Sequence, residues 1–255
     1  MDLSIIIVNY KSKTKLLNCL ESIKRSDLSG LNYEVVIVEN NSGDDLSDLS
    51  HDYKIIYSDK NLGMGGGNNL GIKNSRGDFI LISNPDIVYE PQTISELFNY
   101  LKNNSAVELV GPKLLNPDGT LQYSCVRFPK IYIPILRRTF VGRLFPKSLN
   151  YYLMKANSHQ EVIEVDWLLG ACFMVRRKGT DLFDERYFMY FEDVDLCRRL
   201  KNSGGKVIYY PLVKVIHDHV RASAKMVWYK ALLLDPLSRE HLKSAFKYFY
   251  KWRFK

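Results

Sequence analysis

Two short polar side chains end an apolar stretch near the end of the first third of the chain. Phe79 to Ser83 predicts a buried strand, and Asn84-Pro85-Asp86 follows it directly. Because proline cannot donate to a sheet ladder, the strand should stop there, with both polar residues at its carboxyl end. A carboxylate at that edge is well placed to hold a divalent cation against a phosphate. A simple turn is the alternative, since all three residues favour turns.

A second group of acids follows the aromatic run from Tyr187 to Phe191. Glu192, Asp193 and Asp195 open a predicted helix, where acids cap the chain and interact favourably with the helix dipole. We prefer that structural role for Asp195. Carboxylates that directly follow several aromatic residues are also typical of a general base in a partly desolvated pocket, because burial raises the pKa of a carboxyl.

Two histidines and a glycine-rich segment complete the polar groups. His217 and His219 fall on one side of an extended segment, with a carboxylate between them, and could be metal ligands or structural residues. Asn61 to Gly71 carries glycines that allow close backbone approach, and Asn68 and Asn69 should open a helix. The dinucleotide fingerprint fails because Asn68 stands at its sixth position, and a flexible loop is the alternative.

The elements around these residues predict an α/β fold. Leu3 to Val8, Tyr33 to Val38 and Lys54 to Tyr57 read as strands, and a helix over 14–25 joins the first two as a βαβ unit. The polar turns after the first two strands then share a rim with Asp86. Further predicted elements are a helix over 93–102, a strand over 107–112, a turn at 116–119 with a return strand over 121–125, a buried strand over 165–175, and a last strand over 206–210 closed by Pro211.

Composition limits the function. The chain has 255 residues, 46% of them hydrophobic, and a net charge of +8, which suggests an anionic partner such as nucleic acid, anionic lipid or a phosphorylated substrate. The cysteines are far apart and form no CxxC pair, which argues against zinc and disulfides and fits a reducing compartment. No leader or membrane-spanning stretch is visible, so we expect a cytoplasmic protein that is peripheral on the inner face of the cell membrane.

Two basic segments accompany one predicted domain over 1–236. The insert over 127–155 interleaves arginines and lysines with aromatic residues and contains no acid, which is typical of nucleic-acid or anionic-membrane contact and also of a solvated loop. The tail over 237–255 is amphipathic at helical period, with lysines opposite its apolar face. It should either pack on the domain or lie on an anionic membrane surface.

Together these motifs resemble the inverting GT-A glycosyltransferases of family 2, specifically the rhamnosyltransferase-like branch. The resemblance runs from about Leu3 to Ser223 and rests on 7–10, 38–42, 61–71, Asn84-Pro85-Asp86, Gly170-Ala171 and 191–195. It implies a Rossmann-like mixed sheet flanked by helices. It further implies nucleotide contacts by Asn9, Tyr10, Glu39, Asn41, Gly63, Gly67, Asn69, Asn84 and Asp86.

The resemblance also implies the chemistry. Asp86 matches the last acid of the family's DxD motif and would bind Mg²⁺ or Mn²⁺, with His217 completing the site. Asp193 matches the catalytic base, and the acceptor side is assigned to Trp167, Gly170, Ala171 and Glu192. Asn84 replaces the usual first acid of the motif, so the metal site has one negatively charged ligand fewer. Glu39 replaces a more common aspartate.

The implied reaction moves a sugar from a nucleoside diphosphate to a hydroxyl. One base opposite the leaving group indicates a single displacement with inversion. The expected donor is a dTDP- or UDP-sugar, dTDP-L-rhamnose by the family branch, and the expected acceptor is a saccharide, free or linked to polyprenyl diphosphate. Two other functions stay open: a sugar-1-phosphate nucleotidyltransferase, disfavoured by Asn9-Tyr10-Lys11-Ser12 where a basic glycine loop belongs, and a non-catalytic membrane- or nucleic-acid-binding protein. With the glycosyltransferase, we expect no nucleic-acid partner.

Overall fold

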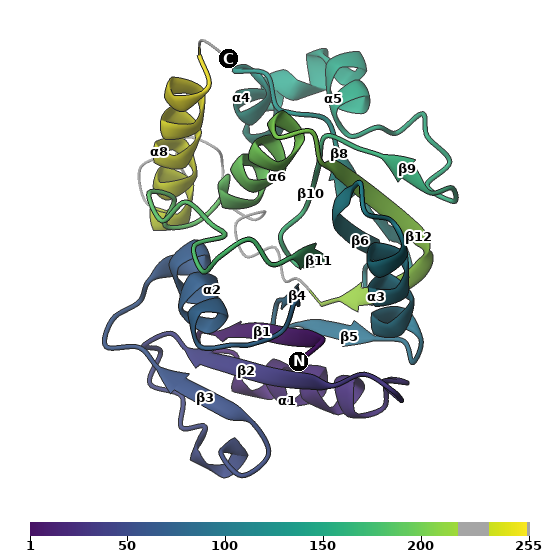
Figure 1. Ribbon diagram of the computed structural model, residues 1–255. Coiled ribbons are helices and arrows are strands. Elements are labelled where there is room, and N and C mark those ends of the chain that lie inside the picture. Colours follow the sequence, from purple (N-terminus) through teal and green to yellow (C-terminus); the bar gives the residue numbers. More distant parts are fainter. Residues whose placement is uncertain (219–234, 254–255) are drawn as a thin grey trace.

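One large mixed sheet forms the centre of the molecule (Figure 1). The computed structural model describes residues 1–218 and 235–253, and its main strand order is β3-β2-β1-β4-β11-β6-β12-β5. The first four strands along the chain run parallel: β1 (Leu3–Asn9), β2 (Tyr33–Glu39), β3 (Lys54–Tyr57) and β4 (Phe79–Ser83). Their carboxyl ends therefore meet at one edge, as the sequence predicted, and the α/β fold class is confirmed.

The second half of the sheet mixes strand directions. β11 (Cys172–Arg176) runs antiparallel between β4 and β6 (Val107–Leu115), and β12 (Lys206–His217) runs parallel to β6. Short strands complete it: β5 (Ile87–Tyr89) and β9 (Ile163–Glu164) pair with β12, β7 (Leu121–Gln122) pairs with β6, and β8 (Cys125–Val126) pairs with β10 (Trp167–Leu168) in a separate two-stranded sheet.

Three strand predictions need correction. The predicted return strand over 121–125 is two short strands, β7 and β8, which belong to different sheets. The last strand does not end at Pro211, because a register shift between Tyr210 and Lys214 absorbs the proline and the strand continues to His217. The predicted strand over 165–175 is two strands, β10 and β11, separated at Gly170. That break frees the Gly170 backbone N–H for another partner.

Helices cover both faces of the sheet. α1 (Lys13–Lys24) and α3 (Thr93–Asn103) pack on one face, and α2 (Gly63–Lys73), α6 (Glu192–Asn202) and α8 (Pro236–Lys251) lie on the other (Figure 1). α1 forms and packs as its sequence predicts, because the buried Leu16, Leu20 and Ile23 recur at helical spacing. A short 3₁₀ turn, Ser47–Leu49, links β2 to β3.

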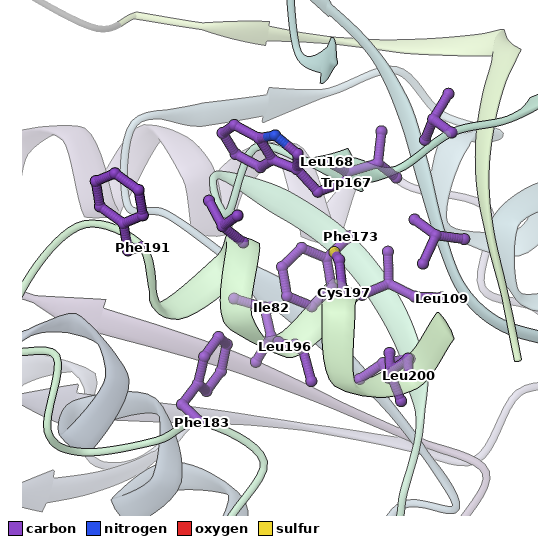
Figure 2. Close-up of a cluster of buried hydrophobic side chains, with 14 of the residues drawn as sticks. Ile82, Leu109, Trp167, Leu168, Phe173, Phe183, Phe191, Leu196, Cys197 and Leu200 are labelled. Carbon is purple, nitrogen blue, oxygen red and sulfur yellow. The ribbon is translucent and has the colours of Figure 1, made fainter. Parts of the chain in front are cut away.

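The core under α6 positions the acids at its start. Figure 2 shows Leu196, Cys197 and Leu200 of α6 in one buried cluster with Phe173 of β11 and Ile82 of β4. Burying a leucine or phenylalanine side chain contributes roughly 1.5–3 kcal/mol. The apolar face of α6 is therefore held on a core to which β4 and β11 contribute.

The basic insert folds into short helices, and the tail helix packs on the domain. The insert contains α4 (Ile133–Arg138), a 3₁₀ turn over 140–144 and α5 (Pro146–Tyr152). Tyr248 and Trp252 of the tail are buried, while Phe246 is 72% exposed. Packing on the domain is thus the outcome for this helix.

Within residues 1–218 and 235–253, no helix has both the length and the apolar character needed to cross a membrane.

Candidate active site

Polar residues gather where β1 and β2 end. Asn9 lies opposite Glu39 in the parallel pairing of the two strands. Asn9 Nδ2 donates to Asp44 Oδ2 at 2.8 Å, and the Ser12 N–H donates to the same oxygen at 3.0 Å. The Asn9 hydrogen bond holds the pKa of Asp44 below its usual value. Asp44 therefore ties two rim loops together, a role that its place in a polar turn did not reveal.

Glu39 and the residues after it shape the same rim. Glu39 Oε1 accepts the Ser42 N–H at 2.7 Å, which fixes the turn after β2. Asn41 adopts a left-handed backbone, φ +57°, and donates to the Asp59 carbonyl at 3.1 Å. Tyr10 is 43% exposed at the end of β1. The rim residues assigned to the nucleotide thus lie together, and their binding role stays a prediction.

The glycine segment packs against protein rather than forming a loop. α2 begins at Gly63, not at Asn68 as predicted. Gly63 has φ +72°, and a Cβ there would clash with the Phe188 carbonyl oxygen, while a Cβ at Gly67 would lie 2.9 Å from Val8 Cγ1. These glycines therefore allow close helix packing, which accounts for them without a ligand.

Asn69 also has a structural role. Its Nδ2 donates to the Phe183 carbonyl at 2.8 Å, and its Oδ1 accepts the Phe183 N–H at 2.9 Å. Nδ2 also donates to Glu185 Oε1 at 3.1 Å. The side chain clamps the segment that leads to α6, so the expectation that Asn69 faces the nucleotide is corrected to a positioning role.

The structure brings Asp86 and His217 together. β12 and β5 pair antiparallel with His217 opposite Ile87, the residue after Asp86. His217 Nε2 consequently lies 3.3 Å from Asp86 Oδ1, and both side chains are largely buried. His219 lies outside the described residues.

Gln122 orients the histidine, and sequence reasoning missed it. His217 Nδ1 lies 2.6 Å from Gln122 Oε1, while Gln122 Nε2 donates to Asn116 Oδ1 at 2.9 Å. Asn116 Nδ2 in turn donates to Thr120 Oγ1 at 2.8 Å. This chain assigns the amide oxygen of Gln122 to the histidine, so Nδ1–H donates to that oxygen and Nε2 faces the Asp86 carboxylate.

A histidine nitrogen and a carboxylate oxygen that lie 3.3 Å apart are donor types that suit Mg²⁺ or Mn²⁺. Within residues 1–218 and 235–253, no three His, Cys, Asp or Glu side chains cluster around one point. The residues therefore fit a cation that takes its other ligands from phosphate and water, which is usual for Mg²⁺. Asn84 Oδ1 is buried without a protein partner in the described part of the chain and could supply a further oxygen.

Asp193 lies beside this turn in a buried position. The Gly170 N–H donates to Asp193 Oδ2 at 2.8 Å, and the Val194 N–H donates to Oδ1, also at 2.8 Å. The carbonyl of Ala171, the residue after Gly170, accepts the Asn84 N–H at 2.8 Å. Gly170 and Ala171 thus join the base candidate to the Asn84-Pro85-Asp86 turn through consecutive backbone groups.

The environment of the acid pair favours proton transfer near neutral pH. Burial raises the pKa of Asp193 to about 6, although the Gly170 N–H works against this shift. Burial and the nearby Asp193 charge raise the pKa of Glu192 to about 8. At pH 7 the pair therefore carries about one negative charge and holds one proton between its two carboxyl groups. Tyr190 and Phe191 enter α6 with left-handed φ values of 68° and 67°, a strained turn of the kind found at functional sites.

Asp195 and Trp167 are structural. Asp195 is fully buried and binds Arg199, Lys251 and Trp252 at 2.7–2.9 Å, which supports the preferred structural role. Trp167 is 6% exposed and donates through Nε1 to the Arg127 carbonyl at 2.9 Å. The expectation that Trp167 faces the acceptor is corrected, because its ring belongs to the core (Figure 2). Arg137, a cation of the basic insert, lowers the pKa of Asp193 by its charge.

The parallel half-sheet, the mixed second half and the helices on both faces match the GT-A fold of solved glycosyltransferase structures. Residues 4–181 match the model of glycosyl transferase family 2. The chain therefore belongs to glycosyl transferase family 2.

Named relatives and a solved structure agree with this family. The chain is 26% identical to rhamnosyltransferase WbbL of Escherichia coli over 96% of this chain and 91% of that protein. It is 31% identical to the N-acetylglucosaminyl-diphospho-decaprenol L-rhamnosyltransferase of Mycobacterium tuberculosis, over 58% of this chain and only 49% of that one. Mannosyltransferase PcManGT of Pyrobaculum calidifontis, solved with GDP-Man and Mn²⁺, shares the fold with a TM-score of 0.61 at 16% identity, over 98% of this chain and 64% of that one.

Proposed function

We propose that this protein is an inverting, metal-assisted rhamnosyltransferase that takes its sugar from dTDP-L-rhamnose. The carrying observation is Asp193, a buried carboxylate that two backbone N–H groups orient beside the Asn84-Pro85-Asp86 turn. The sugar assignment rests on the two rhamnosyltransferases among the relatives. A UDP-sugar at the same site is the second donor class.

The donor occupies the rim and the acceptor approaches from Asp193. Asn9, Tyr10, Glu39 and Asn41 line the rim where the nucleoside binds, next to the turn that carries Asp86. Asp86 and His217 would hold Mg²⁺ or Mn²⁺, with Asn84 nearby, and that cation stabilises the negative charge of the departing diphosphate. Gln122 and Asn116 orient the histidine for this purpose.

Asp193 removes the proton from the acceptor hydroxyl as the oxygen attacks C1 of the sugar. Its pKa of about 6 keeps it ionised at pH 7 and still basic enough to accept a proton. Glu192, neutral at that pH, leaves a single negative charge on this side of the sugar. Because base and leaving group lie on opposite sides of C1, one displacement inverts the anomeric centre.

The proposed acceptor is a saccharide carried on a polyprenyl diphosphate at the cytoplasmic face of a membrane. One relative, the mycobacterial enzyme, is named for a diphospho-decaprenol acceptor. The insert offers the matching surface, with exposed apolar side chains such as Ile131 and Leu144, at 70% and 71% exposure, among exposed cations. A peripheral location on an anionic membrane follows from the same surface.

A turnover assay tests the reaction. Release of nucleoside diphosphate is measured from dTDP-L-rhamnose, UDP-GlcNAc and UDP-galactose, with Mn²⁺ and a farnesyl-diphosphate-linked GlcNAc acceptor. We expect acceptor-dependent release from dTDP-L-rhamnose and its loss in Asp193→Asn. Release from a UDP-sugar alone would replace the donor assignment, and equal release by Asp193→Asn would refute the role of the base.

A further inference from the structure

A basic aromatic pocket lies in the insert, away from the rim. The cavity measures about 290 Å³. Among the described residues that line it are three cations and three tyrosines and no carboxylate: Arg127, Lys130, Lys147, Tyr132, Tyr151 and Tyr152. Cations without acidic partners in one cavity indicate a binding site for an anion.

The pocket has a built wall as well as exposed lysine side chains. The Arg127 guanidinium stacks on the Tyr151 ring at 4.3 Å from its centroid. Arg127 Nε is buried and has no hydrogen-bond partner in the described part of the chain. The Arg127 backbone is held by Trp167 of β10, as described above, and Tyr152 is 4% exposed. A held guanidinium with an unused N–H group matches the geometry of phosphate oxygens.

This pocket adjoins the acceptor side of the site. Burial raises the pKa of Tyr152, the Arg137 charge lowers it, and the Asp193 charge raises it, so this wall residue lies within electrostatic range of the base. The strands give the same result. β8 precedes Arg127 and pairs with β10, and the chain continues from β10 to Gly170, which binds Asp193.

The insert also carries apolar side chains, at positions close in sequence to the residues that line the pocket. Five of them are at least half exposed: Ile131, Ile135, Phe140, Leu144 and Phe145. Exposed apolar residues beside a cationic pocket suit a ligand that carries both a charged group and a hydrocarbon chain.

We propose that the pocket of Arg127, Lys130 and Lys147 binds the diphosphate of a lipid-linked acceptor. The sugar attached to that diphosphate then extends toward Asp193, and the exposed apolar side chains contact the lipid. This inference rests on the proposed function, because it takes Asp193 as the group that receives the acceptor.

Binding of farnesyl diphosphate by calorimetry in EDTA tests the pocket without metal-bridged binding at the rim. Lys130→Gln/Lys147→Gln should weaken binding by roughly tenfold or more, since two cations that pair with the diphosphate are lost. The matched control is Arg25→Gln/Lys102→Gln, which removes the same charge near the carboxyl ends of α1 and α3. It should bind like the wild type. Equal binding by pocket and control variants would overturn the proposal.

Three further ligands separate the sources of the signal. Farnesol and inorganic pyrophosphate should each bind more weakly than farnesyl diphosphate. Pyrophosphate binding of equal strength would reduce the site to a free-phosphate site, and poly(U) RNA binding in place of farnesyl diphosphate would overturn the lipid assignment. Lys130 and Lys147 are exposed, so both variants should unfold at the wild-type temperature. Failure of the proposed function appears separately, as absent nucleotide release in the turnover assay.

Discussion

Replacing Glu192 with glutamine tests the electrostatic account of the acid pair. The pKa of Glu192 is raised from 4.5 to about 8, mainly by burial. The unfolded chain therefore ionises this group first, so its contribution to stability is full below pH 4.5 and is lost as the pH rises through 8. Between pH 6 and pH 8 the wild type should lose about 2 kcal/mol of unfolding free energy from this group alone.

The Glu192→Gln variant has no charge to release, so it should lack that loss. Urea unfolding at pH 6 and pH 8 gives the free energies, and the difference between wild type and variant should change by about 2 kcal/mol over that range. Exposed Glu161 provides the control, since Glu161→Gln should follow the wild type at both pH values. Turnover at pH 7 should survive, because glutamine preserves the neutral form. Parallel wild-type and Glu192→Gln stabilities would refute the raised pKa.

Three further changes test other parts of the site. Gln122→Met removes the acceptor that fixes His217 and should lower Mn²⁺ affinity about 10–100-fold, measured by electron paramagnetic resonance, whereas unchanged affinity would deny Gln122 a positioning role. Asp195→Ala removes the buried acceptor that Arg199, Lys251 and Trp252 share, while Lys251 keeps Asp184, and it should cost about 1–3 kcal/mol in urea unfolding; no measurable loss would contradict the anchoring of α8. Asp193→Asn should lower kcat about 10²–10⁴-fold with donor affinity unchanged by calorimetry, and a parallel loss of donor binding would indicate a binding role instead.

Local patterns predicted the parts of the fold that depend on local sequence. The parallel strands β1 to β4 are apolar runs with polar turns behind them, and these turns do share one rim. The start of α6 was visible because Glu192, Asp193 and Asp195 mark a helix amino terminus. That Asp86 lies near His217 was expected only from the family resemblance, since 130 residues of chain lie between them.

Long-range pairing decided what local patterns missed. Gln122 reaches His217 only because β7 folds back on β6, which lies beside β12. The glycines of α2 looked like a ligand loop, but their spacing serves contacts with Val8 and Phe188 that come from distant segments. The sequence of the tail allowed two alternatives, packing on the domain or lying on a membrane surface. The tail packs on the domain because Lys251 and Trp252 contact the buried carboxylate of Asp195, which lies far away in the sequence.

Calorimetric binding of nucleotide sugars tests the central claim most directly. dTDP-L-rhamnose, UDP-GlcNAc and UDP-galactose are titrated with and without Mn²⁺ into the wild type and Asp86→Ala. The account predicts Mn²⁺-dependent binding of one donor, dTDP-L-rhamnose, and its loss in Asp86→Ala. Donor binding of equal strength in Asp86→Ala, or no binding of any nucleotide sugar with Mn²⁺, would contradict the proposed active site.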